Sequence, residues 1–167
     1  MNFLSSIENW GFSAWVRESP TVWSYPLVIF LHAAGLSMVV GLSSVIDLAI
    51  LGFAPGLPLA PMTKLYRLIG IGFWMNAISG IVLTMIDATT MLVNPIFWIK
   101  MLLIGLAIAD VLVIKKKVFN DPLLDKRPQP ADVRALAILS LLLWTGAVTA
   151  GRLTAYLGAH AGGIARL

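Results

Sequence analysis

Four long apolar stretches constrain this chain more than any other feature of its sequence. A helix needs roughly 20 apolar residues to cross about 30 Å of hydrocarbon. Inside a bilayer the backbone must satisfy its own hydrogen bonds, so spans of this kind are helices. The sequence therefore predicts an all-α integral membrane four-helix bundle. Its expected spans are Pro26 to Phe53, Leu65 to Ile86, Ile96 to Ile114 and Ala135 to Leu157.

Composition agrees with this class and excludes several others. Of the 167 residues, 59% are hydrophobic and 12% are charged, whereas soluble domains usually carry about 25% charged residues. The length allows one domain, so we expect residues 1–167 to form a single membrane domain. The chain has no cysteine, which excludes disulfides, cysteine-ligated iron–sulfur clusters, thiolate zinc sites and c-type haem.

The first 20 residues differ from the spans. Apolar residues recur at roughly helical spacing between polar ones, and Pro20 follows them. The segment has neither a basic start nor a long apolar run, so it does not have the pattern of a signal peptide. We expect residues 1–20 to form an amphipathic helix lying in the membrane interface. Its apolar positions are Phe3, Leu4, Ile7, Trp10, Ala14 and Trp15.

The distribution of lysine and arginine predicts the orientation. Eight of the 12 basic residues flank or occupy the loops after the first and third spans, and cytoplasmic loops carry such an excess. We therefore expect a multi-pass protein of the bacterial inner membrane with both termini in the periplasm. The net charge of +4 then reflects topology and not a nucleic-acid partner. The eight are Lys64, Arg67, Lys115, Lys116, Lys117, Lys126, Arg127 and Arg134.

Three ionisable residues on different spans are expected at a similar depth. His32 lies about 10 Å inward from Tyr25, Lys100 about 7 Å inward from Pro95, and Arg152 about 6 Å inward from the outer end of its span. Ionisable groups in spans usually face the interior of the bundle. Snorkelling toward the headgroups is the alternative for the two cations. His32 is too short and too deep to snorkel.

Imidazole is a common haem ligand in four-helix bundles, and this suggests a b-type haem bound by His32. Lys100 and Arg152 would then bind its propionates. His160 is the other histidine and a candidate second metal ligand, although it lies about 6 Å beyond the last span. Met85, Met91 or five-coordinate iron are the alternatives. The aromatic residues that could wall a flat ring are Phe30, Phe73, Trp74, Phe97, Trp98 and Trp144.

A structural explanation accounts for the remaining polar residues. His32 itself could simply hydrogen-bond a neighbouring helix. Asp47 and Arg67 lie near the inner ends of the first two spans, where we expect a structural ion pair. Asp110 lies deeper and could pair with Arg67 or a loop lysine. For Asn76, near mid-membrane, an interhelical hydrogen bond is favoured over a ligand role.

Several motifs carry a resemblance to known proteins. Val16-Arg-Glu-Ser-Pro20, Tyr25-Pro26, His32-Ala-Ala-Gly35 and Asp47-Leu-Ala-Ile-Leu-Gly52 resemble a family of small bacterial four-helix membrane proteins, over most of the chain. That family implies no established activity. More distantly, the layout is similar to copper-resistance D-type proteins and to membrane protoporphyrinogen-oxidase-like haem proteins. His32, Tyr66-Arg67-Leu68 and Trp98-Ile99-Lys100 carry that likeness.

The oxidase resemblance implies a b-type haem near His32 and Lys100, without the enzyme activity, because the wider oxidase pattern is missing. Soft copper ligands are also missing. We therefore expect a haem b-binding redox protein that exchanges electrons with quinone or a periplasmic partner. An accessory subunit or anchor of a larger complex is the second hypothesis. Transport of a small ion or metal, which would need a homo-oligomer, is the third.

Overall fold

The computed structural model describes residues 3–54, 56–121, 125 and 128–164, the last ten of these (155–164) by their helical backbone alone. This part of the chain contains four helices long and apolar enough to cross a membrane. The predicted all-α membrane bundle is thereby confirmed, and the chain is a multi-pass membrane protein. The four are α3 (Tyr25–Leu51), α4 (Leu65–Ile86), α6 (Pro95–Phe119) and α7 (Ala131–Ile164).

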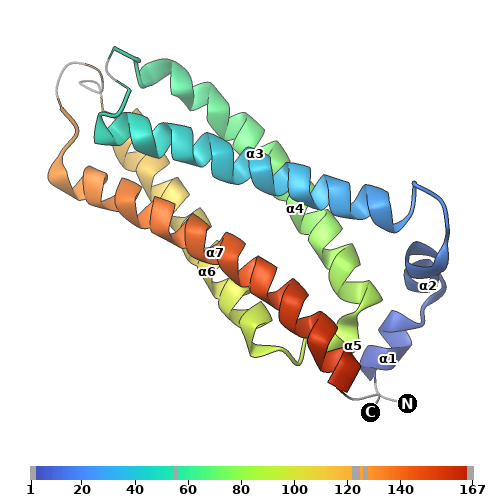
Figure 1. Cartoon of the computed structure of the whole chain (residues 1–167). Helices are drawn as coiled ribbons and strands as arrows, with labels where there is room; N and C mark the ends of the chain where they lie inside the picture. The colour runs from blue at the N-terminus through green and yellow to red at the C-terminus, as the bar shows by residue number, and fades with distance from the viewer. Residues whose placement is uncertain (1–2, 55, 122–124, 126–127, 165–167) are drawn as a thin grey trace.

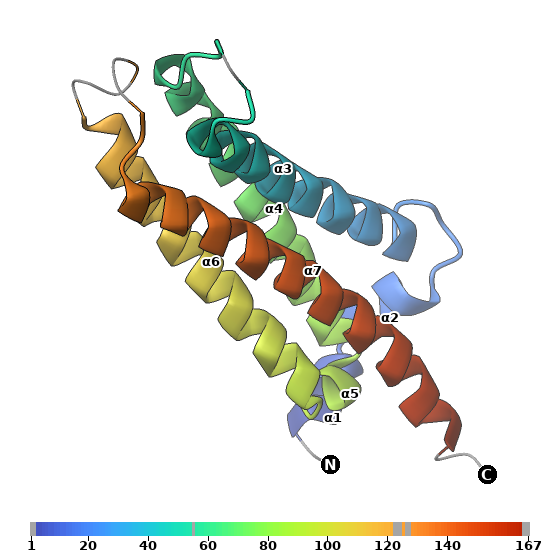
Figure 2. The ribbon, with the colours of Figure 1, turned by 60° about the vertical axis from the view of Figure 1, so that its left-hand side comes forward.

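The four long helices pack as two antiparallel pairs. Helix α3 lies against α4 and α6 lies against α7, while α3 and α7 join the two pairs. Figures 1 and 2 show α3 and α7 close together near the connecting loops and diverging toward the end that holds both termini. The best-packed apolar core accordingly lies toward the loop end. It includes Ile46, Ile50, Ile114, Val118 and Ala137.

Helix ends carry the residues that the backbone requires there. The side chain of Asn94 caps α6 by accepting a hydrogen bond from the amide of Ile96 at 2.9 Å. Pro95 follows at the first helical position, where its missing N–H costs nothing. Helix α3 ends at Gly52, whose φ of 89° is a left-handed conformation that glycine adopts without strain. These residues define where α3 ends and where α6 begins.

Helices α3 and α4 approach each other closely where glycine replaces larger residues. A Cβ atom placed on Gly35 would lie 2.6 Å from the backbone nitrogen of Asn76, and one on Gly72 would lie 2.7 Å from the Cβ of Met38. Small residues permit such backbone approach in membrane helices, whose association depends on packing and hydrogen bonds. This contact sets the distance between the helices beside His32.

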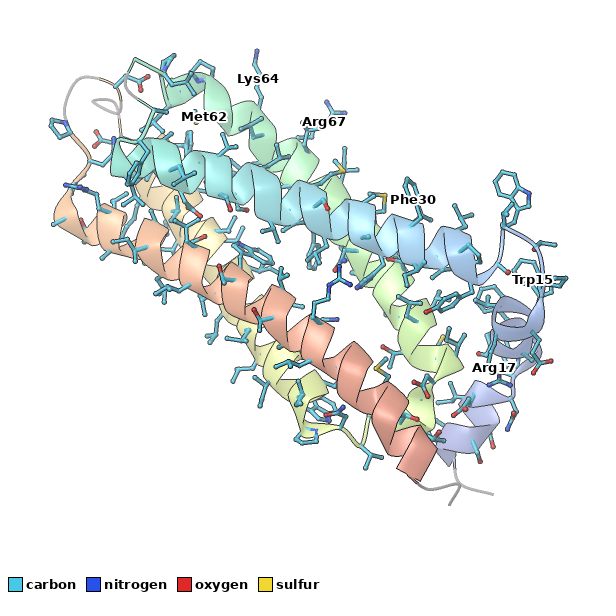
Figure 3. All side chains as sticks on the ribbon, in the orientation of Figure 1. Trp15, Arg17, Phe30, Met62, Lys64 and Arg67 are labelled. Carbon is cyan, nitrogen blue, oxygen red and sulfur yellow. The ribbon has the colours of Figure 1, made fainter. Side chains whose placement is uncertain are left out.

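The outer surfaces of the long helices remain apolar. Large exposed side chains occur on every span, as expected for helices whose outer faces contact lipid and not water. Figure 3 shows Phe30 pointing away from the bundle. Representative outward residues are Ile29, Phe30, Ile71, Trp74, Ile99, Leu102, Leu112, Leu139 and Leu142.

The N-terminal segment is two helices and not the single one expected over residues 1–20. Helix α1 (Phe3–Glu8) and helix α2 (Gly11–Glu18) are separated at Asn9, whose side chain donates to the carbonyl of Ser5 at 2.8 Å. Both helices pack on α4, and α1 also packs on the short α5 (Ala88–Met91), which follows α4 at the end of the bundle away from the connecting loops. The carboxylate of Glu8 accepts from the hydroxyl of Thr89 at 2.7 Å, which fixes α1 to the bundle.

The loop end contains more helix than the apolar stretches indicate. Helix α6 continues to Phe119, and its last turns carry the exposed Lys115, Lys116 and Lys117. Lys117 forms an ion pair with Asp132 at 2.7 Å. The two loops also meet, because the Asp125 carboxylate accepts from the first amides of the 3-10 helix η1 (Ala60–Lys64), at 2.7 Å from Leu59 and 3.2 Å from Ala60.

Candidate functional site

His32 is held at the α3–α4 contact by hydrogen bonds in both directions. Its Nδ1 lies 3.0 Å from the carbonyl oxygen of Asn76 and 3.2 Å from the hydroxyl of Ser79. In return, the amide nitrogen of the Asn76 side chain donates to the His32 carbonyl at 2.8 Å. The interhelical hydrogen bond predicted for Asn76 is confirmed. His32 and Asn76 therefore fix the register of the two helices.

These partners determine which nitrogen of the ring carries the proton. The hydroxyl of Ser79 donates to the Met75 carbonyl at 2.7 Å, so toward His32 it can act as an acceptor. The shortest contact of Nδ1 is to the Asn76 carbonyl, which only accepts. The side-chain nitrogen of Asn76 also lies 3.3 Å from Nδ1, but this contact is longer and the same nitrogen already donates to the His32 carbonyl. The geometry therefore favours Nδ1–H as the donor and a free lone pair on Nε2. Among the described residues no hydrogen bond reaches Nε2.

Glycine makes room for the His32 ring. A Cβ atom placed on Gly80 would lie 3.0 Å from the Cε1 atom of His32, closer than ordinary van der Waals contact. The ring therefore lies against the backbone of α4, on the side of the helix that also carries Asn76 and Ser79. A half-buried imidazole is thus oriented by three residues of the neighbouring helix.

Lys100 lies inside the bundle and near His32. Its half-buried side chain crosses from α6 to α7, where its Cε lies 3.7 Å from the position of a Cβ on Gly151. The Lys100 ammonium is close enough for its charge to act on the His32 imidazole. Interior placement, and not snorkelling, therefore describes this lysine. Arg152 follows Gly151 on α7, but it is exposed.

The remaining candidates lie elsewhere. The side chain of His160 lies outside the described residues. Met85 is at the outer end of α4, five residues beyond Gly80 and thus about 8 Å along the helix, and Met91 lies further on in α5. Among the described residues, no group of three or more histidine, aspartate or glutamate side chains could hold a metal ion. His32 is therefore the one histidine whose side chain the structure describes.

Of the six aromatic rings expected to wall the site, three face outward, two are buried, and Phe73 is partly buried against the core. Phe30 and Trp74 are each 65% exposed and Trp98 is 57% exposed, so these three rings face the lipid. Trp144 and Phe97 are buried inside the bundle. Whether a ring faces outward or inward depends on how its helix is rotated about its own axis.

An apolar groove adjoins the His32 site. It has a volume of about 260 Å³ between α3 and α4, and Ser79 is its polar member. Ser79 also contacts the His32 ring, so the groove and the imidazole share this one residue, and His32 itself does not line the groove. Its other lining residues are Val28, Leu31, Met75, Ile78 and Val82. Sequence reasoning missed this groove, since a uniformly apolar span does not mark one of its faces as hollow.

The inner polar residues do not pair as expected. Asp47 is 2% exposed and its Oδ2 has no hydrogen-bond partner in the described part of the chain. Arg67 is exposed, and Figure 3 shows it pointing away from the bundle. The predicted Asp47–Arg67 ion pair is therefore wrong. The reason is that successive residues point in different directions around a helix, and in α4 Tyr66 packs toward the core while Arg67 is exposed.

Comparison of the chain with protein-family models, with curated proteins and with solved structures gave no match. The family resemblance drawn from the sequence motifs stays a prediction.

Proposed function

We propose that this protein is a haem b-binding membrane redox protein in which Nε2 of His32 is an axial ligand. The observation that carries the proposal is the hydrogen bond from Nδ1 of His32 to the Asn76 carbonyl. Metal-ligating histidines almost always donate their other ring nitrogen to a carbonyl or carboxylate, which fixes the tautomer and increases the basicity of the ligand. His32 meets that condition inside an apolar bundle.

Two further features near His32 support a haem. The groove beside Ser79 offers apolar surface, and its volume of about 260 Å³, below the range of about 300–1,000 Å³ usual for ligand pockets, would take only part of a porphyrin. Lys100 supplies a positive charge inside the bundle on the side of His32, where a propionate would be neutralised, and Arg152 supplies a second cation one residue beyond the Gly151 contact. A haem in this place would supply one-electron redox chemistry. His32 would hold it, Asn76 and Ser79 orient His32, and Lys100 would balance its charge.

Location near the outer face suggests the exchange partners. His32, Lys100 and Arg152 lie in the half of the bundle on the side of the termini, which the excess of basic residues in the opposite loops assigns to the periplasm. Electrons would pass to or from quinone or a periplasmic redox protein. We propose the bacterial inner membrane as the site of action.

Single-cysteine labelling tests this orientation, because the chain has no cysteine of its own. Thr63→Cys lies in the loop before α4 and Thr21→Cys lies between α2 and α3. A membrane-impermeant maleimide added to intact spheroplasts should label the Thr21 variant alone. Labelling of the Thr63 variant alone would reverse the orientation.

A visible spectrum tests the cofactor. Purified protein supplemented with haem should show a Soret band and a reduced-minus-oxidised difference spectrum of the b type. The variant His32→Ala should lose both, and Lys100→Met should bind haem more weakly at the same Soret position. Circular dichroism and the elution volume serve as folding controls. Well-folded wild-type protein without a Soret band would reject the proposal, and a stable co-purifying partner would then favour an accessory subunit.

A further inference from the structure

A second group of polar residues lies in the half of the bundle nearest the loops, away from the half that contains the His32 site. Asp47 of α3 and Asp110 of α6 are 2% and 6% exposed. Asp47 and Asp110 are close enough for a charge on one to act on the other, and Ser140 of α7 lies near Asp47, although the buried Ser140 hydroxyl makes no hydrogen bond in the described part of the chain. Three helices thus bring two carboxyl groups together in the apolar core.

These carboxyl groups lack partners for most of their oxygen atoms. Oδ2 of Asp47 and both carboxyl oxygens of Asp110 make no hydrogen bond in the described part of the chain. The hydroxyl of Ser43, one turn before Asp47, is also buried and unpartnered. Ser43 and Asp47 line the same small space together with Tyr66. An unsatisfied hydroxyl thus adjoins an unsatisfied carboxyl group.

No basic side chain compensates the two carboxyl groups among the described residues. From α4, Tyr66 faces them and Arg67 points outward. From α6, Lys115 is exposed, and its ammonium lies over the Tyr66 ring at 5.3 Å from the centroid. From α7, Ser140 and the buried Trp144 are uncharged. The ion pairs within the described part of the chain join other side chains.

The two buried carboxyl groups would therefore need a bound proton or cation to neutralise them. Burying an unpaired carboxylate in an apolar medium costs far more than burying a neutral carboxyl group. Two neighbouring carboxylates disfavour ionisation further. The space beside Asp47 has no room for a water-sized sphere, so a hydrated cation does not fit it. A proton requires no space of its own.

We propose that Asp47 and Asp110 form a proton-binding site that takes up and releases a proton on the side of the connecting loops. Tyr66 lines the space beside Asp47, and the Lys115 ammonium at the loop end lies over its ring. The site is independent of haem, since no residue of the His32 site belongs to it.

Infrared spectroscopy of the purified protein tests the site. At neutral pH the wild type should show the C=O stretching band of a protonated carboxyl group. The band should shift in D₂O and disappear reversibly at alkaline pH. Asp47→Asn and Asp110→Asn should each change it, and the double variant should lose it. Asp132→Asn is the matched control, because Asp132 is exposed and paired with Lys117, and it should leave the band unchanged.

Two results would overturn the proposal. One is a wild-type spectrum without a protonated-carboxyl band at neutral pH, or a band that persists in the double variant. The other is a band that Na⁺ abolishes and choline does not, which would make the site a sodium site. The double variant is expected to keep the wild-type melting temperature, because an amide mimics a protonated carboxyl group. A misfolded double variant would also contradict the proposal, since it would show that charge at this place is needed.

Discussion

Gly35→Ala should disturb both the bundle and the His32 site. The added Cβ would lie 2.6 Å from the Asn76 nitrogen and 2.7 Å from the Gly72 carbonyl oxygen, whereas ordinary contact begins at 3.4 Å. Going from 2.6 to 3.4 Å requires a local separation of α3 and α4 by about 0.8 Å. Both obstructing groups are backbone atoms, so no side-chain rotation relieves the overlap.

Moving α3 away from α4 would also break the hydrogen bonds between His32 and Asn76. The bonds between His32 and Asn76 measure 2.8 and 3.0 Å, and an added 0.8 Å takes both beyond the range in which such bonds form. Overpacking costs about 1–3 kcal/mol, and an interhelical hydrogen bond in a membrane contributes about 0.6 kcal/mol. We expect Gly35→Ala to lower the free energy of unfolding by about 2–4 kcal/mol.

Titration with sodium dodecyl sulfate in mixed micelles, followed by circular dichroism, measures this change. Gly41→Ala is the matched control on the same helix, because a Cβ there meets nothing within 4 Å. The control should change stability by less than about 0.5 kcal/mol. Equal unfolding curves for the two variants would refute the close α3–α4 contact.

Three further variants test other contacts. Asp125→Ala removes the acceptor for the first amides of η1 and should lower stability by about 1 kcal/mol; an unchanged melting temperature would contradict that link between loops. Glu8→Ala loses its bond to Thr89 and should speed limited proteolysis of the N-terminal helices, with α3–α7 still protected; unchanged proteolysis would argue against the attachment. Gly80→Ala displaces the His32 ring and should weaken haem binding several-fold, and wild-type affinity would be inconsistent with the ring position.

The spans were predictable because crossing a membrane is a property of local composition. Their ends were less so, since a helix ends where its backbone hydrogen bonds end and not where polarity begins. Helix α6 illustrates this, because Lys115 to Lys117 extend it to Phe119 beyond the apolar stretch. Helices α1 and α2 are separated at Asn9 and Trp10, a break that amphipathic periodicity does not reveal.

The sequence predicted how deep the candidate site residues lie in the membrane, but not which way their side chains face. Helical rise alone placed His32 and Lys100 at similar depth, and in the structure the Lys100 ammonium is close enough to act on the His32 imidazole. Which way a residue faces depends on the rotation of its helix, and a helix apolar on all sides gives little sign of that rotation. Arg152 is exposed and Arg67 turns outward for this reason. The orientation of His32 by Asn76 and Ser79 needed the register between α3 and α4, which close packing at Gly35 sets.

Chemical rescue of a cavity variant tests the role of His32 most directly. The variant His32→Gly, purified without imidazole and supplemented with haem, should lack the Soret band of the wild type. Added imidazole should restore it, because the small molecule replaces the missing ligand. A variant that binds haem with an unchanged spectrum before imidazole is added would contradict the account, as would a wild-type protein that never acquires the band.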